Sequence, residues 1–181
     1  MSLKISPTEF LGCWDINFSP FVDHRGSFVK IFHSTAFTEM GIEVTWREQF
    51  WSTSGKGVLR GFHFQSPPAD HAKLVFCTSG KVHDVALDIR KKSQTFGESL
   101  SRILTPQDGN GLFIPKGMAH AFQALEDNST LVYLVETVHS SKHDLGIRWN
   151  SCQVAWSVEN PIVSKRDASF PALADFDSPF F

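Results

Sequence analysis

The sequence predicts an all-β protein, an antiparallel sandwich or barrel made of many short strands. Most segments of the 181-residue chain are apolar, or alternate apolar with polar residues, over strand-length stretches. These stretches follow one another at a spacing of about ten residues, which is typical of sandwiches and barrels. The chain also contains 17 Phe and 5 Trp but only one Tyr, and aromatic residues are enriched in strands.

Turns rich in Gly, Pro, Asn and Asp separate the candidate strands. The strands are expected at residues 27–33, 43–51, 58–64, 74–78, 81–89, 99–104, 111–114, 120–125 and 131–138.

One short helical turn is expected at residues 34–40, with Ser34 as its N-cap and Gly41 as its end. From residue 151 onward the pattern becomes irregular and contains three prolines. This composition predicts a segment that wraps around the barrel rather than a second domain. We therefore expect a single domain over residues 1–181.

Charge and composition exclude several classes of protein. The formal net charge is −2 and basic residues are scattered, so we expect neither a nucleic-acid partner nor a membrane surface. No apolar run approaches the ~20 residues of a membrane span, and we expect no signal peptide. The three cysteines form no CxxC pair, which argues against a disulfide framework or a thiolate zinc site and favours the reducing cytoplasm.

Polar residues are densest in the candidate strand that ends at residue 65. Period-2 alternation places His63 and Gln65 on one face with Gly61, and Phe62 and Phe64 on the other. An inward-facing His63 beside Gln65 would line a barrel mouth with polar groups. The alternative is a hydrogen-bonded core histidine.

Two other segments carry polar residues on candidate strands. Residues 115–120 form a Pro-x-Gly turn that leads into a strand beginning with His120. In the strand at 81–89, Asp84 and Asp88 share one face. Carboxylates at such positions are either solvated on the outside or hydrogen-bonded for a function, and both alternatives remain open.

Several reaction types lack their sequence signatures. A metal-binding site of the His-x-His type is disfavoured, because the residue two positions after His63 is Gln65 and amides are weak ligands for Fe or Zn. No G-x-S-x-G elbow, G-x-G-x-x-G loop or Walker A stretch occurs. These absences argue against a serine hydrolase and against nicotinamide- or ATP-driven chemistry.

Five motifs occur in the order and spacing of one known family. They are DHRGSF at 23–28, GVLRGFHFQ at 57–65, DVALDIR at 84–90, FIPKGMAHAF at 113–122 and GIRW at 146–149. Together they resemble the dTDP-4-dehydrorhamnose 3,5-epimerase family, from about residue 20 to the C-terminus.

The resemblance implies a cupin-type double-stranded β-helix, or jelly-roll, barrel that forms a homodimer and uses no metal or other cofactor. It implies an isomerase of deoxysugar biosynthesis. The substrate would be a nucleotide-linked 4-keto-6-deoxy sugar, with dTDP as the expected nucleotide, epimerised at C3, C5 or both. The chemistry is sound, because the C4 ketone acidifies the hydrogens at C3 and C5. The enzyme then needs a base on one face, an acid on the other and a cation at the enolate oxygen.

The resemblance also assigns catalytic roles to four residues. His63 matches the family's base, and Asp167 matches the carboxylate that orients it. Tyr133, the one tyrosine of the chain, matches the proton donor. Lys73 matches the lysine that faces the C4 oxygen of the substrate.

Further residues match positions that bind substrate in the family. Arg25 and Arg60 match arginines near the diphosphate, and guanidinium groups suit bidentate phosphate contacts. His120 matches a residue of the sugar pocket, and Asp144 matches an acidic residue near the nucleotide.

The sequence departs from the family at the nucleotide end. The family's Q-x-N stretch is Glu48-Gln49-Phe50 here, its glutamate after the first motif is Lys30, and its stacking tyrosine is His139. We expect Gln49, Phe50, Lys30 and His139 to bind substrate in their altered forms. Since the chemical residues are intact, the pattern fits an epimerase of a related sugar or of another nucleotide.

Three alternatives remain open at this level. The enzyme inverts only C3 or only C5 of a different nucleotide sugar, or the chain is a non-catalytic sugar-nucleotide-binding cupin, or it is a metal-dependent cupin. The retained base, acid and lysine argue against a pure binding module, which has no use for an acid opposite a base.

Overall fold

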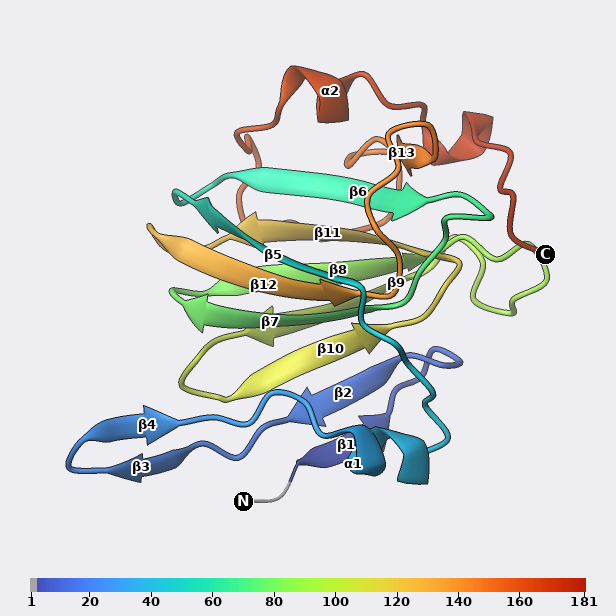
Figure 1. Cartoon of the computed structure of the whole chain (residues 1–181). Coiled ribbons are helices and arrows are strands. Elements are labelled where there is room, and N and C mark those ends of the chain that lie inside the picture. Colours follow the sequence, from blue (N-terminus) through green and yellow to red (C-terminus); the bar gives the residue numbers. More distant parts are fainter. Residues whose placement is uncertain (1–2) are drawn as a thin grey trace.

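The protein, described here from a computed structural model over residues 3–181, is built of two facing β-sheets and a small separate hairpin (Figure 1). The first sheet has the order β1 (Lys4–Pro7), β2 (Trp14–Asn17), β10 (Asn110–Ile114), β7 (Lys73–Ser79), β12 (Ser129–Val135) and β5 (Glu48–Ser54). The second has the order β13 (Asp144–Gly146), β6 (Leu59–Gln65), β11 (Met118–Ala124), β8 (Val82–Asp88) and β9 (Ser99–Leu104). The hairpin consists of β3 (Phe21–Asp23) and β4 (Gly26–Phe28).

Strand alternation divides the apolar residues into three layers. The residues between the two sheets come from inward-facing positions of both, for example Val75, Ala86 and Phe122. The outer face of the six-stranded sheet packs against the segment that contains α1 (Ser34–Glu39), where Phe37 is fully buried. The outer face of the five-stranded sheet is covered by the C-terminal segment, which contributes Phe180.

The all-β, jelly-roll-like architecture predicted from the sequence is confirmed. The strand at 99–104 has the predicted bounds, and five others lie within two residues of them, while the predicted strand 131–138 ends three residues earlier, at Val135. The predicted strand 27–33 ends at Phe28, and the predicted strand 43–51 begins only at Glu48 and runs to Ser54. Strands β1, β2, β3 and β13 were not predicted, because they are short and gain their stability from pairing rather than from their own pattern.

The short helix lies where it was expected, but its predicted N-cap is wrong. Ser34 is the first helical residue and His33 is the N-cap, without a side-chain hydrogen bond to the helix. Gly41, with φ of +74°, follows the C-cap Met40 and ends the helix as predicted.

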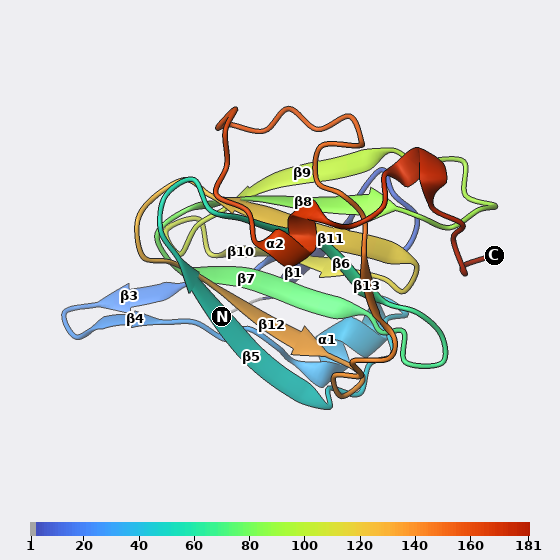
Figure 2. The same cartoon turned by 90° about the horizontal axis from the view of Figure 1, so that it is seen from above.

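The irregular C-terminal segment wraps over the five-stranded sheet and contains two short helical turns (Figure 2). These are α2 (Lys165–Ala168) and the 3₁₀ turn η1 (Leu173–Asp175). The N-cap of α2 is Ser164, whose side chain accepts a hydrogen bond from the backbone N–H of Asp167. This cap fixes the position of Asp167 at the side of β6, with which α2 is in contact.

The hairpin β3–β4 projects away from the two sheets, and both views show it as an arm (Figures 1 and 2). Its large apolar side chains are exposed, with Phe21 at 47% and Phe28 at 55% of their full accessibility. No helix within residues 3–181 has the length and apolar character needed to cross a membrane.

The sequence left open whether the two aspartates of β8 are solvated outside the barrel or hydrogen-bonded inside it, and the structure decides between these alternatives. Asp84 and Asp88 are fully buried, so they are not solvated on the outside of the barrel. Asp88 accepts hydrogen bonds from Arg90, Ser93 and Thr95. Asp84 is hydrogen-bonded to His120. Asp88 is therefore partnered through both of its oxygens, and Asp84 through one.

Candidate functional site

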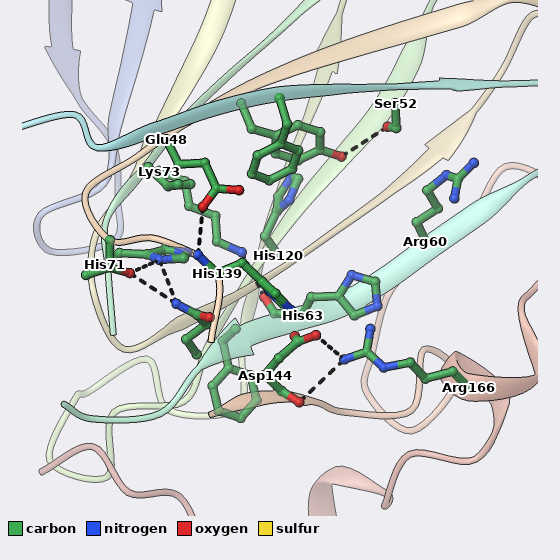
Figure 3. A pocket seen from close by; sticks show the side chains of 16 residues that line it. Glu48, Ser52, Arg60, His63, His71, Lys73, His120, His139, Asp144 and Arg166 are labelled. Atoms are coloured by element: carbon green, nitrogen blue, oxygen red, sulfur yellow. Dashed lines mark hydrogen bonds and ion pairs between the residues drawn. The ribbon is translucent and has the colours of Figure 1, made fainter. Parts of the chain in front are cut away.

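A cavity of about 240 Å³ opens between the two sheets, bounded by β5, β12 and β7 on one wall and by β6 and β11 on the other (Figure 3). Eight of the residues predicted for the site line it: Phe50, Arg60, His63, Lys73, His120, Tyr133, His139 and Asp144. Sequence motifs separated by up to ninety-four positions, from Phe50 to Asp144, thus meet in one place.

His63 is held by Asp167 at the cavity wall. The His63 Nε2 and Asp167 Oδ1 atoms are 2.8 Å apart, and the second carboxylate oxygen accepts the backbone N–H of Gly61 at 3.1 Å. Burial alone would raise the pKa of Asp167, but the hydrogen bond and charge of His63 and the bond from Gly61 hold it below its usual value. The edge of His63 meets the ring of Phe170. The predicted His–Asp pair is thus geometrically in place.

Tyr133 lies on the opposite wall, on β12. Its hydroxyl is 3.5 Å from Ser52 Oγ, and its ring is stacked on Phe50 at 4.7 Å between centroids. Burial raises the pKa of the Tyr133 phenol well above its usual value. The phenol therefore keeps its proton at neutral pH and is able to donate it.

Lys73 is a buried cation at the start of β7. Its Nζ donates a hydrogen bond to the backbone carbonyl of His63 at 3.1 Å, which ties the two walls together. Burial lowers the pKa of Lys73 to about 8, an effect that the carboxylates of Asp144 and Asp84 partly oppose. The remaining N–H bonds of the ammonium are available to an oxygen atom in the cavity.

A second histidine–aspartate pair lies deeper in the barrel. His120 Nε2 is 2.7 Å from Asp84 Oδ1, and both side chains are almost completely buried. The ring of His120 meets the ring of Tyr133 edge to face at 5.7 Å. Asp84 was not among the predicted site residues, although its place in alternation with Ala86 and Asp88 was a usable signal.

The mouth of the cavity carries several charged groups. Glu48 Oε2 accepts the backbone N–H of His139 at 2.6 Å, and Arg166 pairs with Asp144 at 2.7 Å (Figure 3). Arg60 is exposed and donates to Ser54 Oγ at 3.1 Å. Two cationic guanidinium groups and a ring at a cavity mouth suit an anionic, aromatic ligand.

One end of the cavity is closed by a hydrogen-bond network that the sequence did not reveal. Gln65 Nε2 donates to the Ala69 carbonyl, and Gln65 Oε1 accepts the N–H of Ser140. His71 Nδ1 is 2.6 Å from Thr137 Oγ1. Burial, then the charges of Lys73 and Lys116, lower the pKa of His71 to about 3, so its ring is neutral. The network orders the loop after β12 that carries His139.

Three predicted substrate-binding residues do not reach this cavity. Gln49 lies on the outer face of β5, because neighbouring strand residues face opposite ways, and Glu48 and Phe50 take the inward positions. Arg25 lies in the hairpin turn, where it pairs with Asp23 at 2.6 Å. Lys30 follows the hairpin and is likewise absent from the cavity lining.

The cavity residues that were given no catalytic or binding role from the sequence share no motif of their own. They are Glu48, Ser52, Phe64, Gln65, His71, Val135, Thr137 and Arg166. Of these, Gln65 was expected beside His63 at the barrel mouth, and Glu48 belongs to the altered Q-x-N stretch, where strand alternation with known phase would have selected it.

Within residues 3–181, no cluster of three or more His, Cys, Asp or Glu side chains is arranged to hold a metal ion. The donor groups of the cavity are instead paired among themselves, as His63 is with Asp167. The three cysteines are free, and burial raises the pKa of the thiols of Cys13 and Cys152.

Comparison with known proteins gives a consistent result. The family described as dTDP-4-dehydrorhamnose 3,5-epimerase matches residues 7–175 of the chain. The dTDP-4-dehydrorhamnose 3,5-epimerase of Shigella flexneri is 39% identical over 160 residues, covering 87% of this chain and 88% of that protein.

Two solved structures are also similar. An epimerase from Legionella pneumophila in complex with dTDP-4-keto-L-rhamnose is 31% identical, with a TM-score of 0.92 and coverage of 97% of this chain and 95% of that one. A 3'-monoepimerase from Streptomyces bikiniensis in complex with dTDP-quinovose is 28% identical, with a TM-score of 0.88 and coverage of 93% and 87%.

Proposed function

The chain belongs to the dTDP-4-dehydrorhamnose 3,5-epimerase family, and from that premise we propose that its cavity epimerises a nucleotide-linked 4-keto-6-deoxy sugar at C3, C5 or both, without a cofactor. Its members are isomerases of deoxysugar biosynthesis. The observation that carries the proposal for this chain is the position of a paired imidazole and a protonated phenol on opposite walls of one cavity, with a buried ammonium between the sheets.

The reaction follows from these three groups. The imidazole of His63 takes the proton from the carbon next to the C4 ketone, and the electron pair of the C–H bond moves onto the C4 oxygen. The ammonium of Lys73 stabilises the resulting enolate oxygen. Tyr133 gives its proton to the same carbon from the opposite side, which inverts the centre. The tyrosinate then regains a proton and His63 releases one, so the protein returns to its starting state.

Asp167 makes His63 an effective base. A carboxylate at 2.8 Å fixes one ring tautomer and stabilises the imidazolium that forms after proton transfer. The bond from Gly61 to the second oxygen keeps the carboxylate in place.

The direct test is hydrogen exchange at the reacting carbons. The purified protein is incubated with dTDP-4-keto-6-deoxyglucose in ²H₂O, and NMR follows deuterium at C3 and C5 together with the configuration of the product. We expect deuterium at one or both carbons. Absence of exchange with this substrate and with its UDP, CDP and GDP counterparts would refute the proposal.

The same experiment separates the alternatives. A 3'-monoepimerase is among the similar structures, so inversion restricted to C3, or to C5, is the second candidate. It would appear as deuterium and inversion at one carbon. A non-catalytic nucleotide-sugar-binding protein would bind the substrate without any exchange.

We assign the nucleotide to the cavity mouth. Arg60 and Arg166 suit the diphosphate, while Phe50 and His139 offer ring faces to a base. The substrate of the Legionella relative is dTDP-linked, and we propose dTDP here as well. Thermal shifts with dTDP, UDP, CDP and GDP rank the bases, because stabilisation follows affinity; a larger shift with another nucleotide would overturn the dTDP assignment.

We also propose that the protein is a homodimer in which the arm β3–β4 lies on the partner chain. The arm exposes Phe21, Val22 and Phe28, and exposed apolar clusters of this kind are typical of interfaces. The edge strand β5 carries Trp51, exposed at 70%, and offers a surface to receive it. In this arrangement Arg25 reaches the partner's cavity, which would restore its predicted role.

Light scattering tests the dimer, and a mixing experiment tests the role of Arg25. Arg25→Ala and His63→Ala are each expected to be weakly active or inactive alone. Mixed dimers regain one intact site that combines His63 of one chain with Arg25 of the other. A monomeric wild-type protein, or no recovery on mixing, would contradict the arrangement. The cytoplasm remains the expected location.

A further inference from the structure

We propose that Asp84 is a positioning residue for the epimerisation, a buried carboxylate that aims His120 at the cavity and keeps Lys73 in its ammonium form. The inference rests on the proposed function, since it concerns the same cavity. It gives a role to a buried charged group that the mechanism above does not use.

The position of Asp84 is unusual for a carboxylate. It lies on β8, a central strand of the five-stranded sheet, and faces the interior between the sheets with no accessible surface. One oxygen, Oδ1, is bonded to His120. The other, Oδ2, is buried and has no hydrogen-bond partner among residues 3–181. A buried carboxylate oxygen without a partner is costly, which points to a function that its charge serves.

Asp88 shows what a structural carboxylate in the same strand looks like. It is four residues further along β8, faces the same way and is equally buried. Its two oxygens accept hydrogen bonds from Arg90, Ser93 and Thr95. The charge of Asp88 is therefore neutralised locally by Arg90, whereas Asp84 has no arginine or lysine partner within residues 3–181 and is bonded to His120.

The bond to Asp84 determines how His120 faces the cavity. A carboxylate accepts, so the Nε2 of His120 carries a proton toward Asp84. The ring lines the cavity, and the bond from Nε2 to Asp84 is the one hydrogen bond that the ring makes within the described part of the chain. Nδ1 is thus the atom that His120 offers to a bound sugar, and Asp84 is the residue that selects it.

Lys73 lines the same cavity as His120, the hydrogen-bond partner of Asp84. Burial drives the pKa of Lys73 down to about 8, and the carboxylates of Asp144 and Asp84 act against that effect. Asp144 is at the partly exposed mouth and is already paired with Arg166 at 2.7 Å. Asp84 forms no ion pair with an arginine or lysine within residues 3–181 and is bonded to His120, so it supports the ammonium as the second carboxylate beside Asp144.

The groups that face Lys73 come from every strand around the cavity. In the cavity lining they are Arg60 and His63 on β6, His120 on β11, Tyr133 on β12, Asp144 on β13, Glu48 on β5, His71 just before β7, His139 and Arg166, and Asp84 on β8 lies behind His120. Within this set the phenol is neutral and His71 is neutral. Removal of the Asp84 charge therefore leaves Lys73 with weaker compensation, and it loses its proton at a lower pH.

The test compares Asp84→Asn with Asp88→Asn by the deuterium-exchange assay over pH 5 to 10. Asparagine keeps the shape of the side chain and removes the charge. For Asp84→Asn we expect kcat to fall roughly tenfold or more, with a smaller change in KM. We expect the alkaline limb of the rate profile to move to lower pH by about one unit. For Asp88→Asn we expect a lower melting temperature and the wild-type pH profile.

The outcomes separate the possible explanations. If Asp84→Asn loses stability alone and keeps the wild-type pH profile, Asp84 is structural and the inference is overturned. The inference is also overturned if Asp88→Asn shifts the alkaline limb by the same amount, because any buried negative charge would then support the Lys73 ammonium. If the wild-type protein itself shows no exchange, the failure is that of the proposed function.

Two further measurements do not depend on how Asp84→Asn folds. The variant Asp84→Ser carries a smaller side chain that is also uncharged, and its kcat and pH profile are judged in the same way. In wild-type protein with ¹⁵N-labelled histidine, NMR should show His120 with a solvent-protected proton on Nε2 and an Nδ1 resonance that responds to bound nucleotide sugar. A His120 protonated on Nδ1 alone, with Nε2 free, would contradict the assignment.

Discussion

The barrel contains two histidine–aspartate pairs of nearly the same length, and they differ in where they sit. The His63–Asp167 pair spans 2.8 Å and the His120–Asp84 pair 2.7 Å. The His63 side chain is 31% exposed, whereas the His120 side chain is 4% exposed. Hydrogen bonds of nearly the same length thus connect imidazoles that differ strongly in their exposure to solvent. Exposure to solvent decides whether an imidazole can exchange protons with a substrate and with water.

The two pairs are also built differently. Asp167 lies on the helical turn α2 in the C-terminal segment, fixed by the cap at Ser164 and by the N–H of Gly61. Asp84 is a strand residue whose position is set by the sheet itself. The exposed pair is assembled from segments about a hundred residues apart, while the buried pair joins two neighbouring strands. This difference suits the first pair to turnover and the second to fixed positioning.

Removal of each imidazole in turn should have the largest effect and should distinguish the two pairs. His63→Ala should lower deuterium exchange by roughly 10³-fold or more, since the base is gone. His120→Ala should lower it much less, by roughly tenfold, because a positioning donor is lost. Exchange measured by NMR with each variant checks this, with circular dichroism as the control for folding. Equal losses would mean that both pairs act as bases.

Removal of the Tyr133 phenol tests whether Tyr133 or His120 donates the proton that inverts the sugar. Tyr133→Phe should reduce inversion of the sugar by roughly 10²-fold or more, while deuterium exchange with retention continues through His63. Product NMR resolves the two processes. Should inversion persist at the wild-type rate, His120, whose ring is 5.7 Å from Tyr133, would be the donor instead.

Removal of the Asp167 charge tests the contribution of the carboxylate to the exposed His63–Asp167 pair. Asp167→Asn should reduce kcat by roughly 10²-fold, because the imidazolium loses its counter-charge and His63 loses its fixed tautomer. The rate is measured with saturating substrate, and KM is expected to change little. Ser164→Ala is the matched control, since it weakens the cap of α2 without touching the charge; an equally large loss there would indicate that the position of α2 matters more than the carboxylate.

Acid stability should show the smallest effect. The folded-state pKa of Asp167 is below its usual value, so the ionised carboxylate stabilises the fold at any pH above about 4. That contribution disappears as the pH falls through the folded-state pKa. Urea unfolding between pH 3 and 6 should therefore show a shallower loss of stability in Asp167→Asn than in the wild type. Parallel curves would contradict the pKa direction.

The strand faces that line the cavity could be predicted in part from local pattern, whereas the roles proposed for Lys73, Tyr133 and Asp167 came from the family resemblance. Alternation in β6 predicts His63 and Gln65 on the face opposite to Phe62 and Phe64. The structure packs both phenylalanines into the apolar cluster on the outer face of the sheet, although Phe64 also borders the cavity. The motifs around Lys73 and the one tyrosine were placed on strands that do line the cavity. Such predictions succeed because the period of a strand is a local property.

Other features depended on partners far away in the chain. Gln49 and Phe50 were both expected in the site, but adjacent strand residues cannot share a face, and only the register of β5 with β12 shows that Phe50 points inward. The hairpin with Arg25 leaves the barrel, which no local signal revealed. Whether a carboxylate such as Asp84 is solvated or buried depends on what faces it.

By itself the sequence determined the strand periods, the class of fold and the residue types available for the reaction, because these follow from neighbours a few positions apart. The tertiary structure alone decided which face of each strand lies inside, which carboxylate meets which imidazole and how much water each pair retains. The physical reason is that the solvation and pKa of a side chain depend on the groups packed around it, and in this barrel those groups come from strands far apart in the chain.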